Sequence, residues 1–305
     1  MRAVDINSQL QTRNPKLSCM TPEQYCEQKT TDSGSSFHYS FMFLEPDARQ
    51  AMTILYAFCR EVDDVVDECS DPGVARTKLA WWRDEIARAF AGEPQHPVTK
   101  ALQTAIARYN LPQEHFLEII DGMEMDLNHN AYRTFKELSL YCYRAASVVG
   151  LMAAEIFGYQ DRRTLKYAHD LGMAFQLTNI LRDVGEDARR GRVYIPEEDM
   201  LRFKVSRDDI LHGQLDDNMR ALLAFQAERA NHYYRQAFSH LPDDDRYRQR
   251  SGLIMAAVYQ ALLKAIADAD YQVFEQRVNL SPTRKIWIAW QTARREKRQH
   301  LERET

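Results

Sequence analysis

The amino-acid sequence predicts a single all-α domain. Glycine and proline are scarce, with 11 and 10 among 305 residues, which disfavours folds built from sheets and tight turns. Apolar residues recur at helical spacing along most of the chain, and no stretch alternates as a strand does. No Gly/Ser-rich linker and no repeat divides the chain. Because 45% of the residues are hydrophobic, such a bundle can bury a continuous core.

The expected helices begin and end at recognisable capping and breaking residues. Residues 1–19 are polar and aperiodic, which predicts a loose N-terminal tail, and Thr21-Pro22 then supplies an N-cap and a proline at the first helical position. We expect one helical domain over residues 20–293 and the basic end of its last helix over 294–305. After the first helix, further helices are expected over 46–67, 75–91, 98–109, 114–129, 135–157, 162–184, 197–201, 206–211, 219–238, 252–273 and 282–303.

The most apolar segment is the helix expected over 135–157. Residues 145–154 are apolar almost all round, which predicts a helix buried on every side. This run is the longest of its kind in the chain and is about half the length that a membrane-spanning helix needs. We therefore expect a protein that does not cross a membrane.

Charge and cysteine content exclude several functional classes. The formal net charge is −4, so the electrostatic footprint of a nucleic-acid-binding protein is absent. The five cysteines are odd in number and include no C-x-x-C pair, which argues against a disulfide framework or a zinc site. The first twenty residues lack the apolar core of a signal peptide. Together these features favour a cytoplasmic protein with reduced thiols.

Two acidic stretches supply the candidate functional residues. In the first, Asp63 and Asp67 are four residues apart and share a helical face with Arg60 and Tyr56. Like charges at this spacing repel by roughly 0.2–0.5 kcal/mol. Valines surround the pair, so its helix is packed, and the pair needs a compensating cation. Taken alone, such a pair is also common on solvated helices that have no function.

The second stretch repeats this arrangement far downstream. Asp183 and Asp187 are again four residues apart, and Asn179 and Gln176 precede them on the same face. Two such faces across a cavity would offer many hard oxygen ligands, which Mg²⁺ prefers. Mg²⁺ usually combines one or two carboxylates with substrate phosphates and water. The two stretches together predict a Mg²⁺ site that binds a phosphorylated substrate.

Basic and apolar residues indicate how such a site would act. Arginines suit bidentate phosphate contacts, although neutralisation of neighbouring acids is the alternative. Mg²⁺ and arginines stabilise charge on a departing diphosphate, and the apolar helix would keep water from a reactive cation. The combination predicts diphosphate ionisation followed by carbon–carbon bond formation in an apolar cavity. The arginines concerned are Arg60, Arg182, Arg189, Arg190 and Arg192.

These motifs resemble those of the squalene and phytoene synthase family. The run Tyr-Ala-Phe-Cys-Arg-Glu-Val-Asp-Asp-Val-Val-Asp over 56–67 is similar to the family's first aspartate-rich motif. Asn-Ile-Leu-Arg-Asp-Val-Gly-Glu-Asp over 179–187, continued by Gly-Arg-Val-Tyr-Ile-Pro over 191–196, is similar to the second. The resemblance covers about residues 21–293. It implies an isoprenoid-synthase helical bundle with a central apolar cavity, in which residues 20–293 form the catalytic domain.

The resemblance also implies roles for individual residues. Tyr141 is implied in the proton or cation step. A phenol with a pKa near 10 is a poor base at neutral pH. We therefore expect the ring of Tyr141 to stabilise a cation, while the released diphosphate takes the proton. The implied metal ligands, catalytic with Tyr141, are Asp63, Asp67, Asp183 and Asp187, with Asn179 beside them. The residues implied to bind substrate are Ser36, Phe37, Tyr56, Arg60, Gln176, Asn179, Arg182, Arg192, Tyr259 and Arg277, the last two by a weaker match.

Ser36 and Phe37 belong to a loop of small hydroxyl residues over 33–41. On its own this composition predicts either a flap that wraps an anionic group or an ordinary capped turn. The resemblance favours the flap, since the family has one near its substrate.

Within the family, the chain resembles bacterial presqualene diphosphate synthases of hopanoid pathways more than phytoene synthases. The first motif, the Gly-Ser-Ser-Phe flap over 34–37 and the Arg-Val-Asn-Leu-Ser-Pro stretch over 277–282 carry this resemblance. It implies Mg²⁺-dependent head-to-head joining of two farnesyl diphosphates to presqualene diphosphate, for squalene and hopanoid biosynthesis, without NADPH. The alternatives are a phytoene synthase that uses geranylgeranyl diphosphate, a one-enzyme NADPH-dependent squalene synthase, and a non-enzymatic helical protein that binds a partner.

Two further groups of residues have competing interpretations. Asp121, Glu124 and Asp126 are expected to form a solvated face rather than to face the cavity. Trp287 and Trp290 lie among basic residues on the final helix, which is expected to pack on the surface through its tryptophans. The alternative is an interfacial helix in peripheral contact with the inner membrane. The basic residues concerned are Arg284, Lys285, Arg294, Arg295, Lys297 and Arg298.

Overall fold

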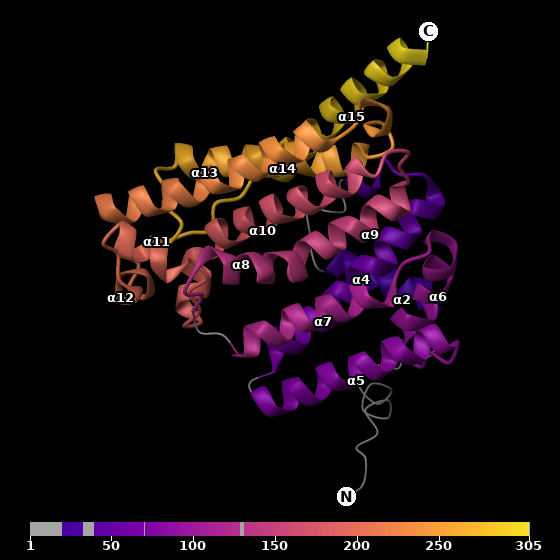
Figure 1. Cartoon of the computed structure of the whole chain (residues 1–305), viewed down its shortest axis with the longest axis horizontal. Coiled ribbons are helices and arrows are strands. Elements are labelled where there is room, and N and C mark those ends of the chain that lie inside the picture. The colour runs from indigo at the N-terminus through magenta and orange to yellow at the C-terminus, as the bar shows by residue number, and fades with distance from the viewer. Residues whose placement is uncertain (1–19, 33–39, 70, 129–130, 305) are drawn as a thin grey trace, which may run out of the picture.

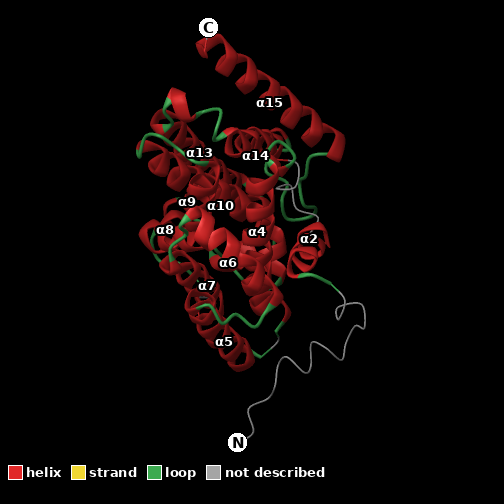
Figure 2. Ribbon diagram, turned by 90° about the vertical axis from the view of Figure 1, so that its right-hand side faces the viewer, coloured by secondary structure: helices red, strands yellow, loops and turns green. Residues whose placement is uncertain are grey.

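The computed structural model describes residues 20–32, 40–69, 71–128 and 131–304. All regular structure within these residues is helical, as predicted (Figure 2). The expected tail over 1–19 and the flap residues Ser36 and Phe37 lie outside the described residues. The helices are α2 (Pro22–Asp32), α4 (Pro46–Glu68), α5 (Pro72–Ala91), α6 (Pro97–Tyr109), α7 (Gln113–Asn128), α8 (Phe135–Cys142), the π-helix η2 (Tyr143–Ser147), α9 (Val148–Phe157), α10 (Arg163–Arg189), α11 (Glu197–Arg202), α12 (Arg207–Leu211), α13 (Asp217–His240), the 3₁₀ helix η3 (Asp243–Asp245), α14 (Arg250–Asp268) and α15 (Pro282–Glu304).

The hydrophobic core has two parts that meet at α9, which supplies residues to both. One part comes from α2, α4, α5, α6 and α7, with one face of α9 against them. The other comes mainly from α8, α10, α13 and α14. In Figure 1, α5 lies at one end of the stack of helices, α8 to α10 lie in the middle, and α15 lies at the far end. A polar cavity lies between the two parts of the core.

Helix α4 buries one face and presents the other to the cavity. Leu55, Phe58 and Val62 are fully buried, at positions that repeat every three to four residues. This apolar face holds the helix against the first part of the core. The prolyl residue at the helix start supplies a fixed φ at a position where no backbone donor is needed. The first acidic stretch is thereby held on a packed helix, as predicted.

Helix α10 extends five residues beyond its predicted end at Val184. The whole second acidic stretch, including Asp187, is therefore helical. The last turns of α10 are in close contact with another stretch of backbone. A Cβ added at Gly185 would lie only 2.5 Å from the carbonyl oxygen of Val273. The segment after α14 thus packs directly on α10.

The helix predicted over 135–157 is interrupted by the π-helix η2. Helix α10 lies very close to η2 at this point. A Cβ added at Gly172 of α10 would lie only 2.5 Å from the Cα atom of Ser147. The prediction that residues 145–154 are buried on every side is wrong. Val149, Gly150 and Ala153 are only half-buried, since they line an apolar pocket inside the bundle.

Two helices of the described chain meet the length and composition of a membrane span. They are Phe135–Phe157, which comprises α8, η2 and α9, and Arg250–Asp268, which is α14. Both supply residues to the core, such as Met152 and Ile254, which are fully buried. Their apolar character is therefore accounted for by packing within the bundle.

The C-terminal part of the chain differs from prediction in two respects. Helix α14 ends at Asp268 rather than at residue 273, because Asp270 and Tyr271 adopt positive φ values of 51° and 58°. Helix α15 does not pack through its tryptophans. Trp287 and Trp290 are 55% and 44% exposed, and the helix instead turns a different face toward the bundle.

Candidate active site

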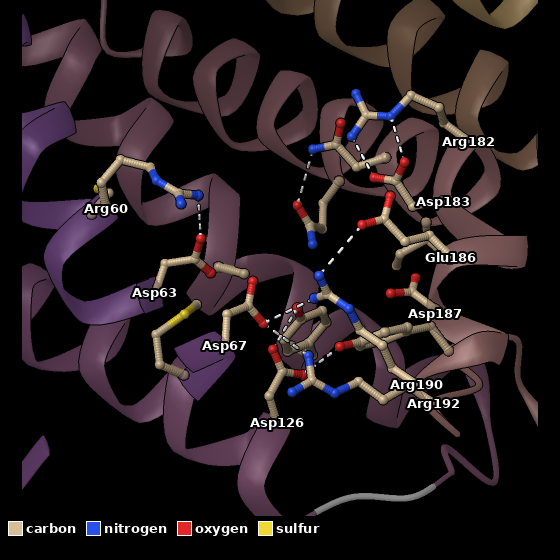
Figure 3. Close-up of a pocket in the computed structure, with 18 of the residues that line it drawn as sticks. Arg60, Asp63, Asp67, Asp126, Arg182, Asp183, Glu186, Asp187, Arg190 and Arg192 are labelled. Atoms are coloured by element: carbon tan, nitrogen blue, oxygen red, sulfur yellow. Dashed lines mark hydrogen bonds and ion pairs between the residues drawn. The ribbon is translucent and has the colours of Figure 1, made fainter. Parts of the chain in front are cut away.

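A polar cavity of about 570 Å³ lies between α4 and α10. Figure 3 shows Asp63 and Asp67 on one side and Asp183 and Asp187 on the other. The two acidic stretches therefore face each other, as the sequence indicated. Of the arginines expected to contact phosphate, Arg189 lies outside this cavity, because its guanidinium donates to the carbonyl oxygen of Phe274 at 2.9 Å. The other predicted site residues within the described chain line the cavity, namely Tyr56, Arg60, Asp63, Asp67, Tyr141, Gln176, Asn179, Arg182, Asp183, Asp187, Arg190, Arg192, Tyr259 and Arg277.

On the α4 side, Arg60 bridges two carboxylates. Its two terminal nitrogens lie 2.5 Å from Asp63 Oδ2 and 2.5 Å from Asp64 Oδ1. Lys29 Nζ also contacts Asp64 Oδ2, at 2.8 Å. Asp64 had no role in the sequence interpretation, and the structure gives it one, since it fixes Arg60 from outside the acidic pair. Burial raises the pKa of Asp63 to about 6, with Arg60 opposing the rise and Asp67 adding to it.

On the α10 side, the two aspartates differ in charge environment. Asp183 accepts hydrogen bonds from Arg182 and, at 2.7 Å, from Arg277 Nε. Burial acts to raise the pKa of Asp183, but the hydrogen bonds and charges of these arginines outweigh it and lower the pKa. Asp187 receives less compensation, and burial, followed by the charge of Asp183, raises its pKa to about 7. On each side of the cavity one carboxyl group, Asp63 or Asp187, thus has a pKa that burial raises well above its usual value.

The segment that follows α10 links the two sides. Arg192 Nη1 lies 3.2 Å from Asp67 Oδ1, and Arg190 Nη1 lies 3.4 Å from the same oxygen. Arg190 also contacts Glu186 of α10 (Figure 3). These arginines occupy the space between the aspartate faces, where a phosphate group would need cationic partners.

The donor set fits an oxygen-preferring cation. The Oδ1 atom of Asn179 is buried and accepts no hydrogen bond in the described part of the chain, while its Nδ2 donates to Gln176 Oε1 at 3.4 Å. A buried oxygen without a partner costs free energy until a donor or a cation meets it. Asp63 and Asp187 add carboxylates whose raised pKa values a cation would lower. Mg²⁺ matches these hard oxygen ligands.

Protein side chains alone do not complete a metal site here. Among the described residues, no three acidic, histidine or cysteine side chains converge closely enough to hold an ion. Mg²⁺ commonly takes only one or two carboxylates and completes its shell with water and substrate phosphate. The cavity therefore fits a cation that arrives with a phosphorylated substrate.

Asp126 is a cavity residue that the sequence interpretation assigned wrongly to a solvated face. It accepts hydrogen bonds from the hydroxyls of Tyr141, at 3.1 Å, and Tyr194, at 2.9 Å. The two tyrosine rings stack with centroids 5.3 Å apart. Burial raises the pKa of Asp126 to about 6, although both tyrosine hydrogen bonds act to lower it. Asp121 and Glu124 instead pair with Arg83, outside the cavity.

The sequence does contain a signal for this difference. Asp126 lies five residues after Asp121, which places it about 140° further round the helix. Asp121 and Asp126 therefore cannot share one face. The sequence interpretation treated them as one group and so missed the inward residue, together with Tyr194 and the cavity-lining Lys285.

An apolar pocket of about 190 Å³ adjoins the polar cavity. Five residues line both spaces, namely Tyr56, Cys59, Ala145, Gln176 and Asn179. From this shared end the apolar pocket extends along α9 to Phe157 and along α10 to Tyr167. Each of these paths spans 12 residues, or roughly 18 Å of helix. A polar group and an attached hydrocarbon chain could thus occupy the two spaces together.

Known proteins resemble this chain over most of its length. The model of the squalene/phytoene synthase family matches residues 30–284. The 15-cis-phytoene synthase of Synechococcus elongatus is 37% identical over 279 residues, which covers 86% of this chain and 89% of that protein. The 15-cis-phytoene synthase of Synechocystis sp. is 34% identical over 294 residues, which covers 90% and 86%.

Solved structures of related enzymes share the fold. A dehydrosqualene synthase in complex with a ligand superposes with a TM-score of 0.79 and 28% identity, covering 90% of this chain and 96% of that one. The squalene synthase HpnC from Alicyclobacillus acidocaldarius gives a TM-score of 0.74 and 30% identity, covering 82% and 94%. The chain therefore belongs to the squalene/phytoene synthase family of all-α isoprenoid synthases, whose members join isoprenyl diphosphates head to head.

Proposed function

We propose that this chain is a Mg²⁺-dependent prenyltransferase that joins two farnesyl diphosphates into presqualene diphosphate and diphosphate. The observation that carries the choice of substrate is the length of the apolar pocket, roughly 18 Å from Asn179 to Tyr167 along α10. With C–C bonds of about 1.5 Å, the extended farnesyl main chain is roughly 14 Å long and the geranylgeranyl main chain roughly 19 Å. The farnesyl main chain is clearly shorter than this pocket, whereas the geranylgeranyl main chain would need its whole length, which favours the shorter substrate.

The proposed chemistry assigns distinct tasks to the two spaces. Arg60, Arg182, Arg192 and Arg277 would hold phosphate oxygens in the polar cavity. Mg²⁺, held by Asp63, Asp67, Asn179, Asp183 and Asp187, would neutralise charge on the departing diphosphate. The apolar walls would exclude water from the carbocation. No cavity residue would need to act as a nucleophile.

The reaction balances without a further reactant. The C1–O bond of the first farnesyl diphosphate breaks, and its electron pair leaves with the diphosphate. C1 then bonds to C2 of the second molecule, which leaves positive charge at C3. Loss of a proton from C1 closes the cyclopropane, and the released diphosphate accepts that proton. Burial raises the pKa of Tyr141 well above that of a free phenol, so its hydroxyl would keep its proton. Its ring would then stabilise the cation. No step requires NADPH.

A second candidate is a phytoene synthase that uses geranylgeranyl diphosphate. The names of the relatives from Synechococcus elongatus and Synechocystis sp. favour it. This function would use the same polar cavity with a longer hydrocarbon. Its substrate would need the whole length of the apolar pocket, as far as Tyr167.

Product analysis separates these functions. The purified protein is incubated with Mg²⁺ and farnesyl diphosphate without NADPH, and in parallel with geranylgeranyl diphosphate, and products are identified by mass spectrometry. We expect presqualene diphosphate from the first mixture. Turnover of the longer substrate alone would overturn the proposal in favour of a phytoene synthase. Squalene that forms only after addition of NADPH would indicate a one-enzyme squalene synthase.

Variants test whether the acidic faces carry the reaction. We expect Asp187→Asn to reduce turnover by roughly 100-fold or more while the fold is kept, because a cation-binding oxygen is lost. Asp268→Asn is the matched control, since Asp268 is 61% exposed at the end of α14 and lies outside the cavity. Equal activities of the two variants would argue against catalysis at this site and for the non-enzymatic alternative.

A further inference from the structure

Helix α15 carries two stacked tryptophans that face away from the bundle. The ring centroids of Trp287 and Trp290 lie 5.5 Å apart, and the side chains are 55% and 44% exposed. Arg294 places its guanidinium 5.3 Å from the Trp290 ring centroid, and Leu301 further along is 52% exposed. Figure 2 shows α15 as the outermost helix of the bundle, at the opposite end from α5. Large exposed aromatic residues of this kind commonly mark an interaction surface.

These residues lie on one side of the helix. Trp287, Trp290, Arg294, Arg298 and Leu301 follow the three- and four-residue spacing that places side chains on one face. We call these five residues the outer face of α15. It is the surface that would meet a partner lying along the helix.

The opposite side of α15 accounts for its attachment to the protein. Ala289, Thr292 and Glu296 are buried, again at three- and four-residue spacing. Glu296 is 1% exposed and pairs with Arg246 from the bundle at 3.1 Å. The helix is therefore held in place without its tryptophans, and their exposure is not needed for the fold.

The charge around the outer face is strongly positive although the whole chain has a net charge of −4. Between Pro282 and Leu301 the only acidic residue is the buried Glu296. Arg298 lies 3.5 Å from the exposed carboxylate of Glu302, one turn beyond it, whereas the surface nearer the tryptophans presents cations without exposed carboxylates of its own. The basic residues in this interval are Arg284, Lys285, Arg294, Arg295, Lys297 and Arg298.

We propose that the outer face of α15 binds the surface of a lipid bilayer that contains anionic lipids. Tryptophan side chains prefer the boundary between headgroups and hydrocarbon, and flanking lysines and arginines attract anionic headgroups. Charge complementarity favours this occupant over a second copy of the chain. A two-fold dimer through the same face would bring two cationic helices together, which disfavours association.

The surface also lies close to the cavity. Lys285, in the first turn of α15, lines the polar cavity, and Trp287 follows two residues later. A bilayer held by the outer face would lie within a short distance of the site along the same helix. The proposal does not depend on the identity of the prenyl substrate, because vesicle binding is measured without substrate.

Vesicle flotation tests the proposal. The full chain is mixed with vesicles of phosphatidylcholine alone or with added phosphatidylglycerol, and the bound fraction is measured at low and high salt. We expect binding to the anionic vesicles that weakens with salt, and a loss of at least about tenfold in Trp287→Ala/Trp290→Ala. The charge variant Arg294→Gln/Lys297→Gln/Arg298→Gln should also bind more weakly.

Matched controls keep the result interpretable. Lys100→Gln/Lys136→Gln/Lys166→Gln removes the same charge from exposed positions on α6, α8 and α10 and should bind as the unmodified chain does. Helical circular dichroism should be unchanged in every variant. The proposal is overturned if the unmodified chain does not bind anionic vesicles, or if the tryptophan variant binds equally well. It is also overturned if ultracentrifugation shows a dimer that the tryptophan variant loses.

Discussion

Asp126 joins two tyrosine side chains that come from distant parts of the chain. Tyr141 belongs to α8, and Tyr194 to the segment that follows α10. An ionised carboxylate accepts both hydroxyl hydrogens and thereby fixes both rings at the wall of the cavity. The carboxylate is a positioning group, because the rings rather than Asp126 itself would face a cation.

We expect Asp126→Asn to lower kcat by roughly 10–100-fold with little change in KM, because the two hydroxyls donate to different carboxylate oxygens and the variant replaces one of these oxygens by an amide nitrogen, which donates. The parent kcat should also show an inflection near pH 6 that is weaker in the variant, because burial raises the pKa of both Asp126 and Asp63 to about 6 and only one of the two groups is removed. Asp121→Asn, five residues earlier on α7, is the control, since Asp121 pairs with Arg83 outside the cavity. Steady-state kinetics across pH provide the measurement, and equal losses in both variants would contradict the assignment.

Sequence spacing identifies residues whose partners lie on the same helix. Asp63 with Asp67 and Asp183 with Asp187 are each separated by one turn, so their common direction follows from helix geometry. Asp126 finds its partner Tyr194 at a separation of 68 residues, which no local pattern encodes. Roles that depend on such distant contacts required the structure.

At the scale of elements, the π-helix η2 is a product of tertiary contact. Most helix boundaries lie within a few residues of the predicted ones because caps and breakers are local signals. The interruption at Tyr143–Ser147 has no such signal in its own residues. It lies where the backbone of α10 comes closest, at Gly172, and it orients Ala145 toward both pockets. The sequence of one helix could not predict a change imposed by another.

Gly172→Ala tests this contact. The new Cβ would lie 2.5 Å from Ser147 Cα and 2.8 Å from its backbone nitrogen, so the two helices must separate. We expect a loss of roughly 1–3 kcal/mol in the free energy of unfolding, together with lower kcat. Gly73→Ala in the first turn of α5 is the control, because its Cβ would meet only Asp71 Oδ1, at 3.1 Å. Denaturant titration of both variants provides the measurement, and similar midpoints would count against the close contact.

At the scale of the whole molecule, the bundle concentrates acidic groups in its centre. Asp63, Asp126 and Asp187 come from three helices, and burial raises the pKa of each. The sequence suggested that α4 and α10 face each other only through the chemistry of their residues, since no local pattern sets the distance between two helices. The depth of the apolar pocket likewise depends on how α9, α10 and α14 pack. When no cation is present, ionisation of these buried carboxyl groups therefore lowers the free energy of unfolding.

This cost predicts how stability changes with pH in metal-free protein. The folded state holds a proton on Asp187 up to pH about 7, whereas the unfolded chain releases it near pH 4. The stabilising contribution is thus complete below pH 4 and is lost as pH rises through 7. Relative to Asp187→Asn, the unmodified protein should lose on the order of 2 kcal/mol between pH 5 and 8, after allowance for solvent screening.

Urea titrations of both proteins in EDTA at each pH measure this difference. Buried histidines such as His96, whose pKa burial lowers, contribute equally to the pH dependence of both proteins, so their contribution drops out of the comparison. Addition of Mg²⁺ with inorganic diphosphate should restore the stability of the unmodified protein above pH 7, because the bound cation compensates the ionised carboxylates. The exposed Asp268→Asn should track the unmodified protein throughout. A pH-independent difference between the unmodified protein and Asp187→Asn would show that Asp187 is not held protonated by the fold, and would remove the electrostatic reason for a cation at this position.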